Sequence, residues 1–347
     1  MPETLVAVVP GAALIVLVAW DVLLTLLHPT ARGPLSYAVN RITWSAARAT
    51  SIRLLRRRGL AYAGPLAVAT NVLAWVFALW VGFALVYLPF ADSITYAASV
   101  PRAEGIPAAL YLSGAALTTV GFGDVVATGN VLRLVTTMEA ASGFGVLSAA
   151  IAFVLSIYPL ISQMRSTGIH LTDAGALELE GATRVAREAG PSELAATVHG
   201  LTENHEHLRR FPVLYYFESG NPEESLSAVV RASSLLLVSL HCLPTADVPH
   251  KRVYCQVLER SLLRLLDDLD RDFVGGRRRT LPEPDVDPKD AEIRMTALCG
   301  KIVPQGDRAG EHDPGRARLG VLLARAETVL EAFAEEHGQT ARRLLPE

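Results

Sequence analysis

Apolar residues gather in the first half of the chain, where three long stretches alternate with polar segments. These stretches run from Thr4 to Leu27, from Pro65 to Phe90 and from Leu134 to Ile161. Each exceeds the roughly 20 residues that a helix needs to cross a bilayer. The first does not have the form of a secretion signal, because no basic residue precedes it, its apolar run is too long and no small-residue cleavage site follows. The pattern therefore predicts three transmembrane helices.

From about residue 163 onward, apolar positions recur with the 3.6-residue period of helices and are separated by Pro and Gly. This half of the sequence has no clear strand pattern and no Gly-x-Gly-x-x-Gly, so neither a Rossmann domain nor a cyclic-nucleotide β-roll is predicted. The fold class is expected to be all-α throughout. The helices predicted in this half are 172–188, 192–210, 222–242, 250–273, 289–302 and 317–337.

Composition changes this picture little. Half of the residues are hydrophobic and the formal net charge is only −3, which gives no indication of nucleic-acid binding. The three cysteines, Cys242, Cys255 and Cys299, are too widely spaced for a zinc site or a disulfide framework. They are expected to be reduced cytoplasmic thiols.

The distribution of arginines predicts the orientation in the membrane. Residues 31–64 contain seven arginines and no acidic residue, so this loop is expected in the cytoplasm. The amino terminus is then outside, and residues after about 162 are cytoplasmic, in a multi-pass protein of the plasma membrane. These arginines lie outside the apolar spans, which argues against a voltage sensor.

An amphipathic helix at the membrane surface is the favoured structure for residues 36–58, with a basic loop that has no lipid specificity as the alternative. Its lipid-facing residues are expected to be Ile42, Trp44, Ile52 and Leu55. The arginines expected near anionic headgroups are Arg53, Arg56, Arg57 and Arg58.

The segment from Ile106 to Thr118 is apolar but too short to span, and it begins with Pro107 in its first turn. It leads directly into Thr119-Val120-Gly121-Phe122-Gly123-Asp124. Non-helical backbone at membrane depth persists only where it is buried in protein or lines a water-filled path. Gly121 and Gly123 tolerate positive φ, which lets successive carbonyls point the same way. The pattern predicts a re-entrant helix followed by a non-helical loop that lines a water-filled path.

This arrangement resembles that of the bacterial single-pore potassium channels, whose filters have closely related sequences. The resemblance covers roughly residues 65–162, with one additional helix in front. It divides the chain into a transmembrane helix (1–30), a basic interfacial helix (31–64), an ion channel pore domain (65–162) and a helical cytoplasmic domain (163–347).

The resemblance also implies roles for individual residues. The carbonyls of Thr119, Val120, Gly121 and Phe122 would bind K⁺, and the Thr119 hydroxyl would complete the innermost site. Thr118, Asp124 and Tyr111 would support the filter, with Val120 and Phe122 packed behind it and Phe122 against Tyr111. Four identical chains are needed to surround the ion with a closed ring of these carbonyls. K⁺ is the permeant ion, and no other cofactor and no catalytic residue are expected.

Two features depart from the family pattern. Phe122 stands where tyrosine is commoner, which removes a hydroxyl group behind the filter. Ala115 stands where some members carry a glutamate that pairs with the filter aspartate. The sequence therefore leaves the support around Asp124 open.

Two acidic residues and two glycines lie within predicted spans. Glu139 is expected to have a structural role behind the filter, against Thr118 or Thr137, with a cation site in the cavity as the alternative. Asp21 is expected to pair with an arginine of the following loop. Gly143 lies nineteen residues after Asp124, at the gating-hinge position of the family. For Gly143 and Gly145, bending and close packing both remain open.

Competing functions make different demands on the sequence. A non-selective cation channel is expected to carry an acidic residue in place of Phe122, and a potassium transporter subunit needs four repeats in one chain. A membrane-anchored sensor would act through the soluble half. There, His199, Glu203 and His207 have i, i+4, i+8 spacing that suits a metal, although a solvated polar face is the favoured interpretation.

Overall fold

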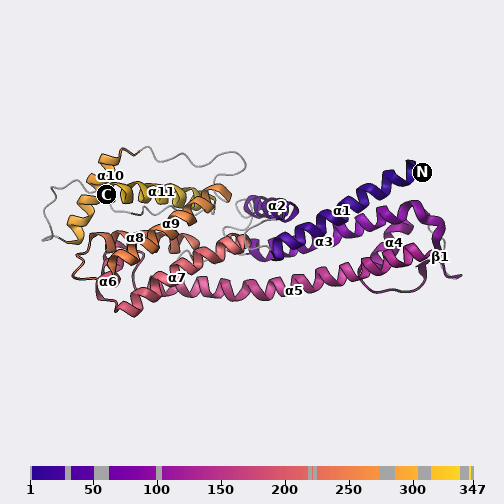
Figure 1. The fold of residues 1–347 in the computed structure, drawn as a ribbon, viewed down its shortest axis with the longest axis horizontal. Helices are drawn as coiled ribbons and strands as arrows, with labels where there is room; N and C mark the ends of the chain where they lie inside the picture. Colours follow the sequence, from indigo (N-terminus) through magenta and orange to yellow (C-terminus); the bar gives the residue numbers. More distant parts are fainter. Residues whose placement is uncertain are drawn as a thin grey trace. The chain divides into compact units, whose positions relative to one another are not determined.

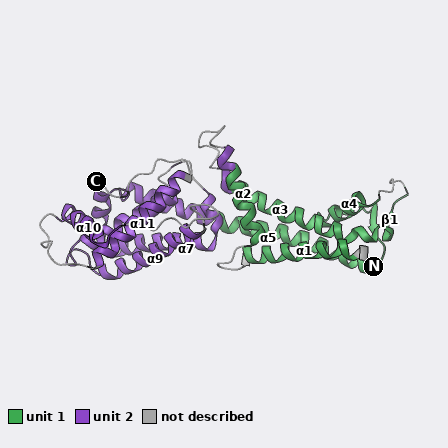
Figure 2. Ribbon diagram, turned by 90° about the horizontal axis from the view of Figure 1, so that it is seen from above, with its two compact units in different colours: residues 1–46, 65–158 green, residues 47–64, 159–347 purple. Residues whose placement is uncertain are grey.

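The computed structural model describes residues 2–27, 33–50, 62–98, 104–217, 221, 225–272, 286–303, 314–336 and 344. It divides into two compact units, which are coloured separately in Figure 2. The first comprises Met1–Ala46 and Pro65–Tyr158, and the second comprises Ala47–Gly64 and Pro159–Glu347.

The first unit contains the long apolar helices, whose positions along the chain are labelled in Figure 1. In chain order these elements are α1 (Pro2–Leu27), α2 (Pro34–Thr50), α3 (Ala63–Tyr87), α4 (Ile106–Leu117) and α5 (Asn130–Asp173), of which α5 continues into the second unit. Three candidate membrane spans, Leu5–Leu26, Ala63–Ser93 and Asn130–Asp173, are long and apolar enough to cross a bilayer. The prediction of three spans is therefore confirmed. The third helix includes Pro159 and ends at Asp173, twelve residues beyond the predicted end at Ile161.

A short antiparallel ribbon interrupts the otherwise helical first unit. A 3₁₀ segment, η3 (Leu88–Ser93), leads into β1 (Ile94–Tyr96), which pairs with β2 (Val125–Ala127) in the register Ile94 to Ala127. The sequence did not predict these strands, because three residues are too few to show an alternating pattern.

The core of the first unit forms around one face of α3. Its large side chains recur every fourth residue, so that they line up along the helix. They are Trp75, Leu79, Phe83 and Tyr87, packed with Leu112 and Leu117 of α4, Val125 of β2, and Leu132 and Val146 of α5. The first helix packs closely on α3 as well, since a Cβ on Gly11 would lie 2.6 Å from the carbonyl oxygen of Gly82. Such contacts between small residues are a common way for membrane helices to associate.

The second unit is helical in its described parts. Its elements are α6 (Leu179–Glu188), α7 (Pro191–Arg210), η4 (Pro212–Tyr216), α8 (Leu226–Cys242), α9 (Lys251–Asp272), α10 (Pro288–Ile302) and α11 (Pro314–Glu336). Almost every residue of α8 is buried, and this helix contacts α6, α9, α10 and α11. The predicted helices match these elements, with one clear exception. The predicted 172–188 helix is broken at Gly175, whose positive φ of 72° ends the helical path.

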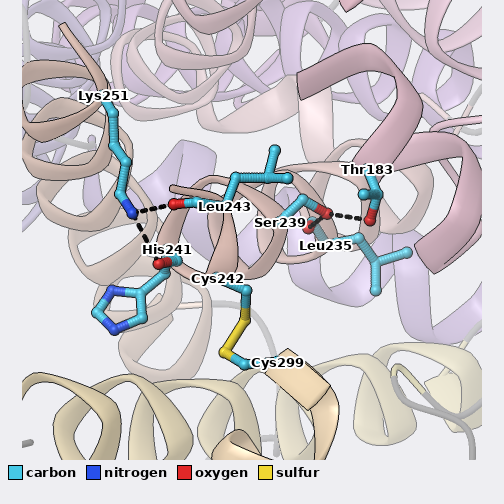
Figure 3. Close-up of a disulfide and its surroundings, with 8 residues drawn as sticks. All are labelled: Thr183, Leu235, Ser239, His241, Cys242, Leu243, Lys251 and Cys299. Atoms are coloured by element: carbon cyan, nitrogen blue, oxygen red, sulfur yellow. Dashed lines mark hydrogen bonds between the residues drawn. A yellow bond between two sulfur atoms is a disulfide. The ribbon is translucent and has the colours of Figure 1, made fainter. Parts of the chain in front are cut away.

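One cysteine prediction is wrong. Cys242, at the end of α8, and Cys299, in α10, form a disulfide with a Cα–Cα distance of 4.9 Å (Figure 3). Packing of α10 against α8 brings together cysteines that are 57 residues apart, a proximity that spacing alone does not reveal. Cys255 stays free, and burial raises the pKa of its thiol to about 11.

A buried histidine makes the stability of the second unit sensitive to acid. His205 lies on α7 and shares a hydrogen bond with Ser261 of α9. Burial lowers the pKa of His205 from 6.5 to about 4, because the charged ring would lose its hydration. Below about pH 6.5 the unfolded chain therefore binds a proton that the folded chain excludes.

We expect the free energy of unfolding of this unit to be unaffected by His205 above about pH 6.5 and to fall by about 2 kcal/mol by about pH 5. Thermal unfolding of the detergent-solubilised full-length protein across this range measures the effect. His205→Gln should flatten the dependence, whereas His199→Gln, at a side chain that is 77% exposed, should leave it intact. Equal slopes for wild type and His205→Gln would refute this assignment.

Candidate functional site

The candidate site is the loop that follows α4. The buried face of α4 packs against α3, and polar contacts with Trp80 hold it there. Trp80 of α3 donates its indole N–H to the carbonyl of Leu110 at 2.8 Å, and Ser113 Oγ lies 2.9 Å from the carbonyl oxygen of Trp80. The buried residues of α4 are Ala108, Ala109, Leu112, Ser113, Ala116 and Leu117. The predicted helix of 106–118 is therefore present, and it ends one residue earlier than expected, at Leu117.

The loop backbone adopts a left-handed conformation at every second residue. Thr119, Gly121 and Gly123 have φ values of 58°, 52° and 75°. The glycines tolerate this conformation as predicted, but it was not predicted at Thr119, whose Cβ disfavours it. Hydrogen bonds to the last turn of α4 hold the loop, from Thr119 N to Ala116 O at 2.9 Å and from Gly121 N to Ala115 O at 3.3 Å.

This backbone differs from a strand in a way that matters for ion binding. In an extended strand, successive residues face opposite sides. A left-handed residue at every second position breaks that alternation and can direct consecutive carbonyl oxygens to one side. A non-glycine residue in this region is strained, and such strain persists where the surrounding structure imposes it, often at functional sites.

The outer end of the loop is anchored at Asp124. The Tyr111 hydroxyl donates to Asp124 Oδ2 at 2.7 Å, and the Ala97 amide donates to the Asp124 carbonyl at 2.8 Å. Tyr111 lies one turn before Ala115 on α4, so it supports Asp124 from a neighbouring position of the same helix. The expected contact between Phe122 and Tyr111 is not found among the described residues, where the Tyr111 hydroxyl bonds to the Asp124 carboxylate.

Two side chains of the loop are also less covered than expected. In the single chain, Val120 is 54% exposed and Phe122 is 71% exposed. The packing predicted behind the filter is therefore not supplied by this chain alone.

Glu139 lies behind the loop, with partners that the sequence did not identify. The carboxyl group is buried between three helices, where Oε1 accepts from the Ser113 hydroxyl and Oε2 accepts from the Tyr87 hydroxyl at 2.6 Å. The predicted partners are wrong, because each threonine bonds to its own helix. Thr118 donates to the carbonyl of Gly114, and Thr137 donates to that of Arg133.

Asp21 caps a helix and does not pair with an arginine among the described residues. Its carboxylate is buried and accepts from the amides of Leu35 and Ser36, at 2.7 and 3.1 Å, at the start of α2. The Ser36 hydroxyl and the indole N–H of Trp75 also donate to it, the latter at 2.8 Å. Free amides and the positive end of the helix dipole provide the charge compensation expected from arginine.

The surface helix differs in part from its prediction. Trp44 is buried, so it does not face lipid, whereas Ile42 is exposed. The remaining residues predicted for contact with lipid lie outside the described residues: Ile52, Leu55, Arg53, Arg56, Arg57 and Arg58.

The two inner-helix glycines have different surroundings. A Cβ on Gly143 would lie 2.1 Å from the carbonyl oxygen of Leu117, the last residue of α4, whereas a Cβ on Gly145 would meet nothing within 4 Å. Gly143 therefore allows α5 to approach the end of α4, and no other residue type fits there without displacement. The sequence singled out Gly143 by its distance from Asp124, but it did not reveal the contact with Leu117 that separates the two glycines.

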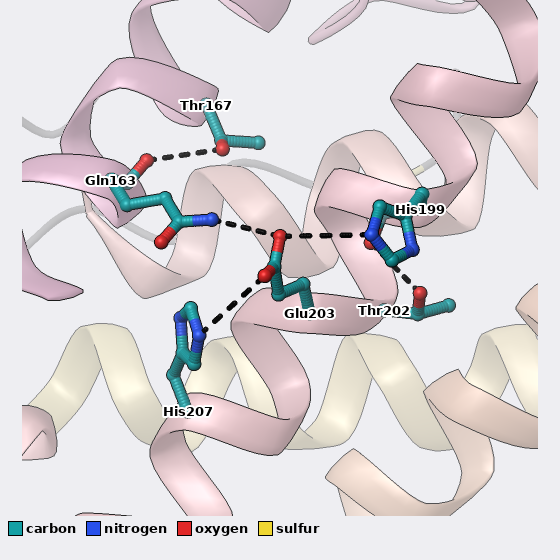
Figure 4. Close-up of polar contacts among 6 residues, drawn as sticks. All are labelled: Gln163, Thr167, His199, Thr202, Glu203 and His207. Carbon is teal, nitrogen blue, oxygen red and sulfur yellow. Dashed lines mark hydrogen bonds and ion pairs between the residues drawn. The ribbon is translucent and has the colours of Figure 1, made fainter.

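The predicted polar triplet of the second unit lies around Glu203 on α7 (Figure 4). Glu203 accepts a hydrogen bond from Gln163 Nε2 at 2.8 Å and lies 4.0 Å from His199 Nε2 and from His207 Nε2. Burial lowers the pKa of His207. Among the described residues, no group of three or more His, Cys, Asp or Glu side chains is arranged to hold a metal ion.

Comparison with known proteins identifies the same region. Residues 72–158, from α3 through the loop to α5, match a family model described as "Ion channel". The match indicates an ion channel. The chain is also 23% identical over 271 residues to the "Uncharacterized membrane protein YdjJ" of Bacillus subtilis (strain 168). The matched region covers 76% of this chain and 77% of that protein. No solved structure matches the chain.

We expect Gly143→Ala to disturb the loop, because the added methyl group must displace the Leu117 carbonyl. Overpacking of this kind costs about 1–3 kcal/mol, so ion flux should fall by about tenfold or more. The ion preference should change as well, which separates close packing from a simple hinge, since a hinge would change opening alone. Single-channel recordings and reversal potentials measure both quantities.

Gly145→Ala is the matched control, because it adds the same methyl group to the same helix in open space. It also makes the helix more stable by about 1 kcal/mol. Wild-type flux and selectivity in Gly143→Ala would show that the contact with Leu117 is unimportant.

Proposed function

We propose that the chain is one subunit of a potassium-selective channel in the plasma membrane. The observation that carries this proposal is the left-handed backbone at Thr119, Gly121 and Gly123, directly after α4. K⁺ crosses a membrane when oxygen atoms replace its hydration shell in a narrow path. The carbonyls of Thr119, Val120, Gly121 and Phe122 provide these oxygens, and the Thr119 hydroxyl completes the innermost site.

The pore helix adds a favourable field for a cation. The carboxyl end of a helix carries a partial negative charge of about half an electron. Because α4 ends at Leu117, two residues before Thr119, this negative end lies next to the inner end of the filter. The arrangement supports a cation pathway and opposes an anion pathway.

Four chains assemble around the pathway. One loop surrounds an ion on one side only, so a closed symmetric ring of identical loops is required. The exposed side chains of Val120 and Phe122 give each loop a surface for its neighbours. We therefore propose a homotetramer.

The arginine pattern supports an orientation with the amino terminus outside and the second unit in the cytoplasm. Residues 31–64 then lie at the inner leaflet, where anionic lipids attract their arginines. Disulfides are uncommon in that compartment and usually form transiently. The Cys242–Cys299 bond therefore weighs against this orientation.

Bi-ionic reversal potentials in liposomes test the selectivity. We expect the wild type to prefer K⁺ over Na⁺ by at least about tenfold, which is about 1.4 kcal/mol of discrimination. Phe122→Asp should reduce this preference, because it adds charge and opens the outer sites. Phe122→Tyr, which keeps the ring, should retain it. Equal permeability of the two ions in the wild type would contradict the proposal and leave a non-selective cation channel.

A further inference from the structure

We propose that the inner helix positions the selectivity filter through Glu139 and Gly143, and that Glu139 is a positioning residue for ion selectivity. The inference rests on the proposed potassium channel function. Neither residue touches the loop itself, so each acts through the pore helix.

The geometry consists of two contacts on successive helical turns. Glu139 and Gly143 lie four residues apart on α5, and Ser113 and Leu117 lie four residues apart on α4, so each pair shares a helix face. The Ser113 hydroxyl bonds to the Glu139 carboxyl group, and the Leu117 carbonyl lies against Gly143. The first contact is polar and directional, and the second is a close steric fit. Together they fix both the rotation and the separation of the two helices.

The carboxyl group also joins a third helix to this contact. Tyr87, the last residue of α3, donates to the second oxygen of Glu139. All three side chains are buried, and an acidic group at membrane depth is costly unless it is paired. Breaking one of these hydrogen bonds would leave a buried polar group unsatisfied, which favours retention of the complete arrangement.

The filter depends on the last turn of α4. Thr119 N–H and Gly121 N–H bond to the carbonyls of Ala116 and Ala115, which lie within that turn. Thr119 holds a strained left-handed conformation and therefore needs external support. Functional groups of this kind need placement within roughly 0.5 Å. A shift of α4 would consequently reach the ion-binding carbonyls directly.

The placement of Glu139 also argues against a cation site in the cavity. Its side chain is fully buried within the single chain, and its two oxygens accept from α4 and α3. A carboxylate that binds ions from the pore needs an oxygen open to water. The structure therefore assigns Glu139 to the support of the filter.

Asp21 is a matched control, because it is another buried membrane carboxylate. Its partners belong to α2 and α3, and none of its hydrogen bonds involves α4. Loss of a buried acid without loss of filter support can thus be measured in the same protein.

The test is the K⁺/Na⁺ permeability ratio of full-length variants in liposomes, with the tetramer yield as a check on folding. Glu139→Leu, of similar size but without polar atoms, should lower the ratio by about tenfold. Glu139→Gln can still accept from Tyr87 and donate to Ser113, so it should keep the ratio close to wild type. Asp21→Asn should leave the ratio unchanged even where it lowers the yield.

If Glu139→Leu does not assemble, Ser113→Ala and Tyr87→Phe each remove one hydroxyl partner and should lower the ratio less. Where Glu139→Leu does assemble, a double-mutant cycle applies: adding Ser113→Ala to Glu139→Leu should have little further effect on the permeability ratio. A wild-type ratio in Glu139→Leu, or in both single-hydroxyl variants, would overturn the inference while leaving the proposed function intact. A non-selective wild type would instead defeat the proposed function, and this inference with it.

Discussion

The polar backbone of the loop from Thr119 to Gly123 must be satisfied at membrane depth without forming a helix. Lipid offers no hydrogen bonds, so such a loop needs either protein partners or a water-filled path. The structure supplies protein partners at both ends, with amides bonded to the last turn of α4 at one end and β1–β2 pairing beside Asp124 at the other. The carbonyls between these anchors remain available for an ion.

Much of the first unit can be understood as support for that loop. The pore helix is fixed by Trp80 of α3, by Glu139 and by the close approach of Gly143. Buried acids occur where helices must be joined in a setting that offers no hydrophobic driving force between them. Asp21 joins α1 to α2 and α3, and Glu139 joins α5 to α4 and α3.

The sequence predicted the parts of the fold that depend on local pattern. The three spans, the pore helix and the helices of the second unit follow from the length and period of apolar residues, which are properties of single segments. The partners of Glu139 and Asp21, the Cys242–Cys299 bond and the role of Gly143 depend on which helices meet. They could not be read from spacing, because the contacting residues are separated by up to 57 positions.

The candidate site shows the same division between local and long-range features. The two glycines of the loop allowed its positive φ angles to be predicted from the sequence. The positive φ of Thr119 opposes the local preference of that residue, and the hydrogen bond from Thr119 N–H to the last turn of α4 supports it. The sequence predicted a contact of Tyr111 with Phe122, whereas in the structure the Tyr111 hydroxyl bonds to Asp124.

The central claim is that four copies of this loop form one K⁺ pathway. The most direct measurement is a cryo-electron microscopy map of the full-length protein in lipid nanodiscs, with K⁺ and with Na⁺ as the only cation. The account predicts fourfold symmetry, with density for K⁺ on the axis between the carbonyls of Thr119 to Phe122. A different number of subunits, or an axis that does not pass between these loops, would contradict it.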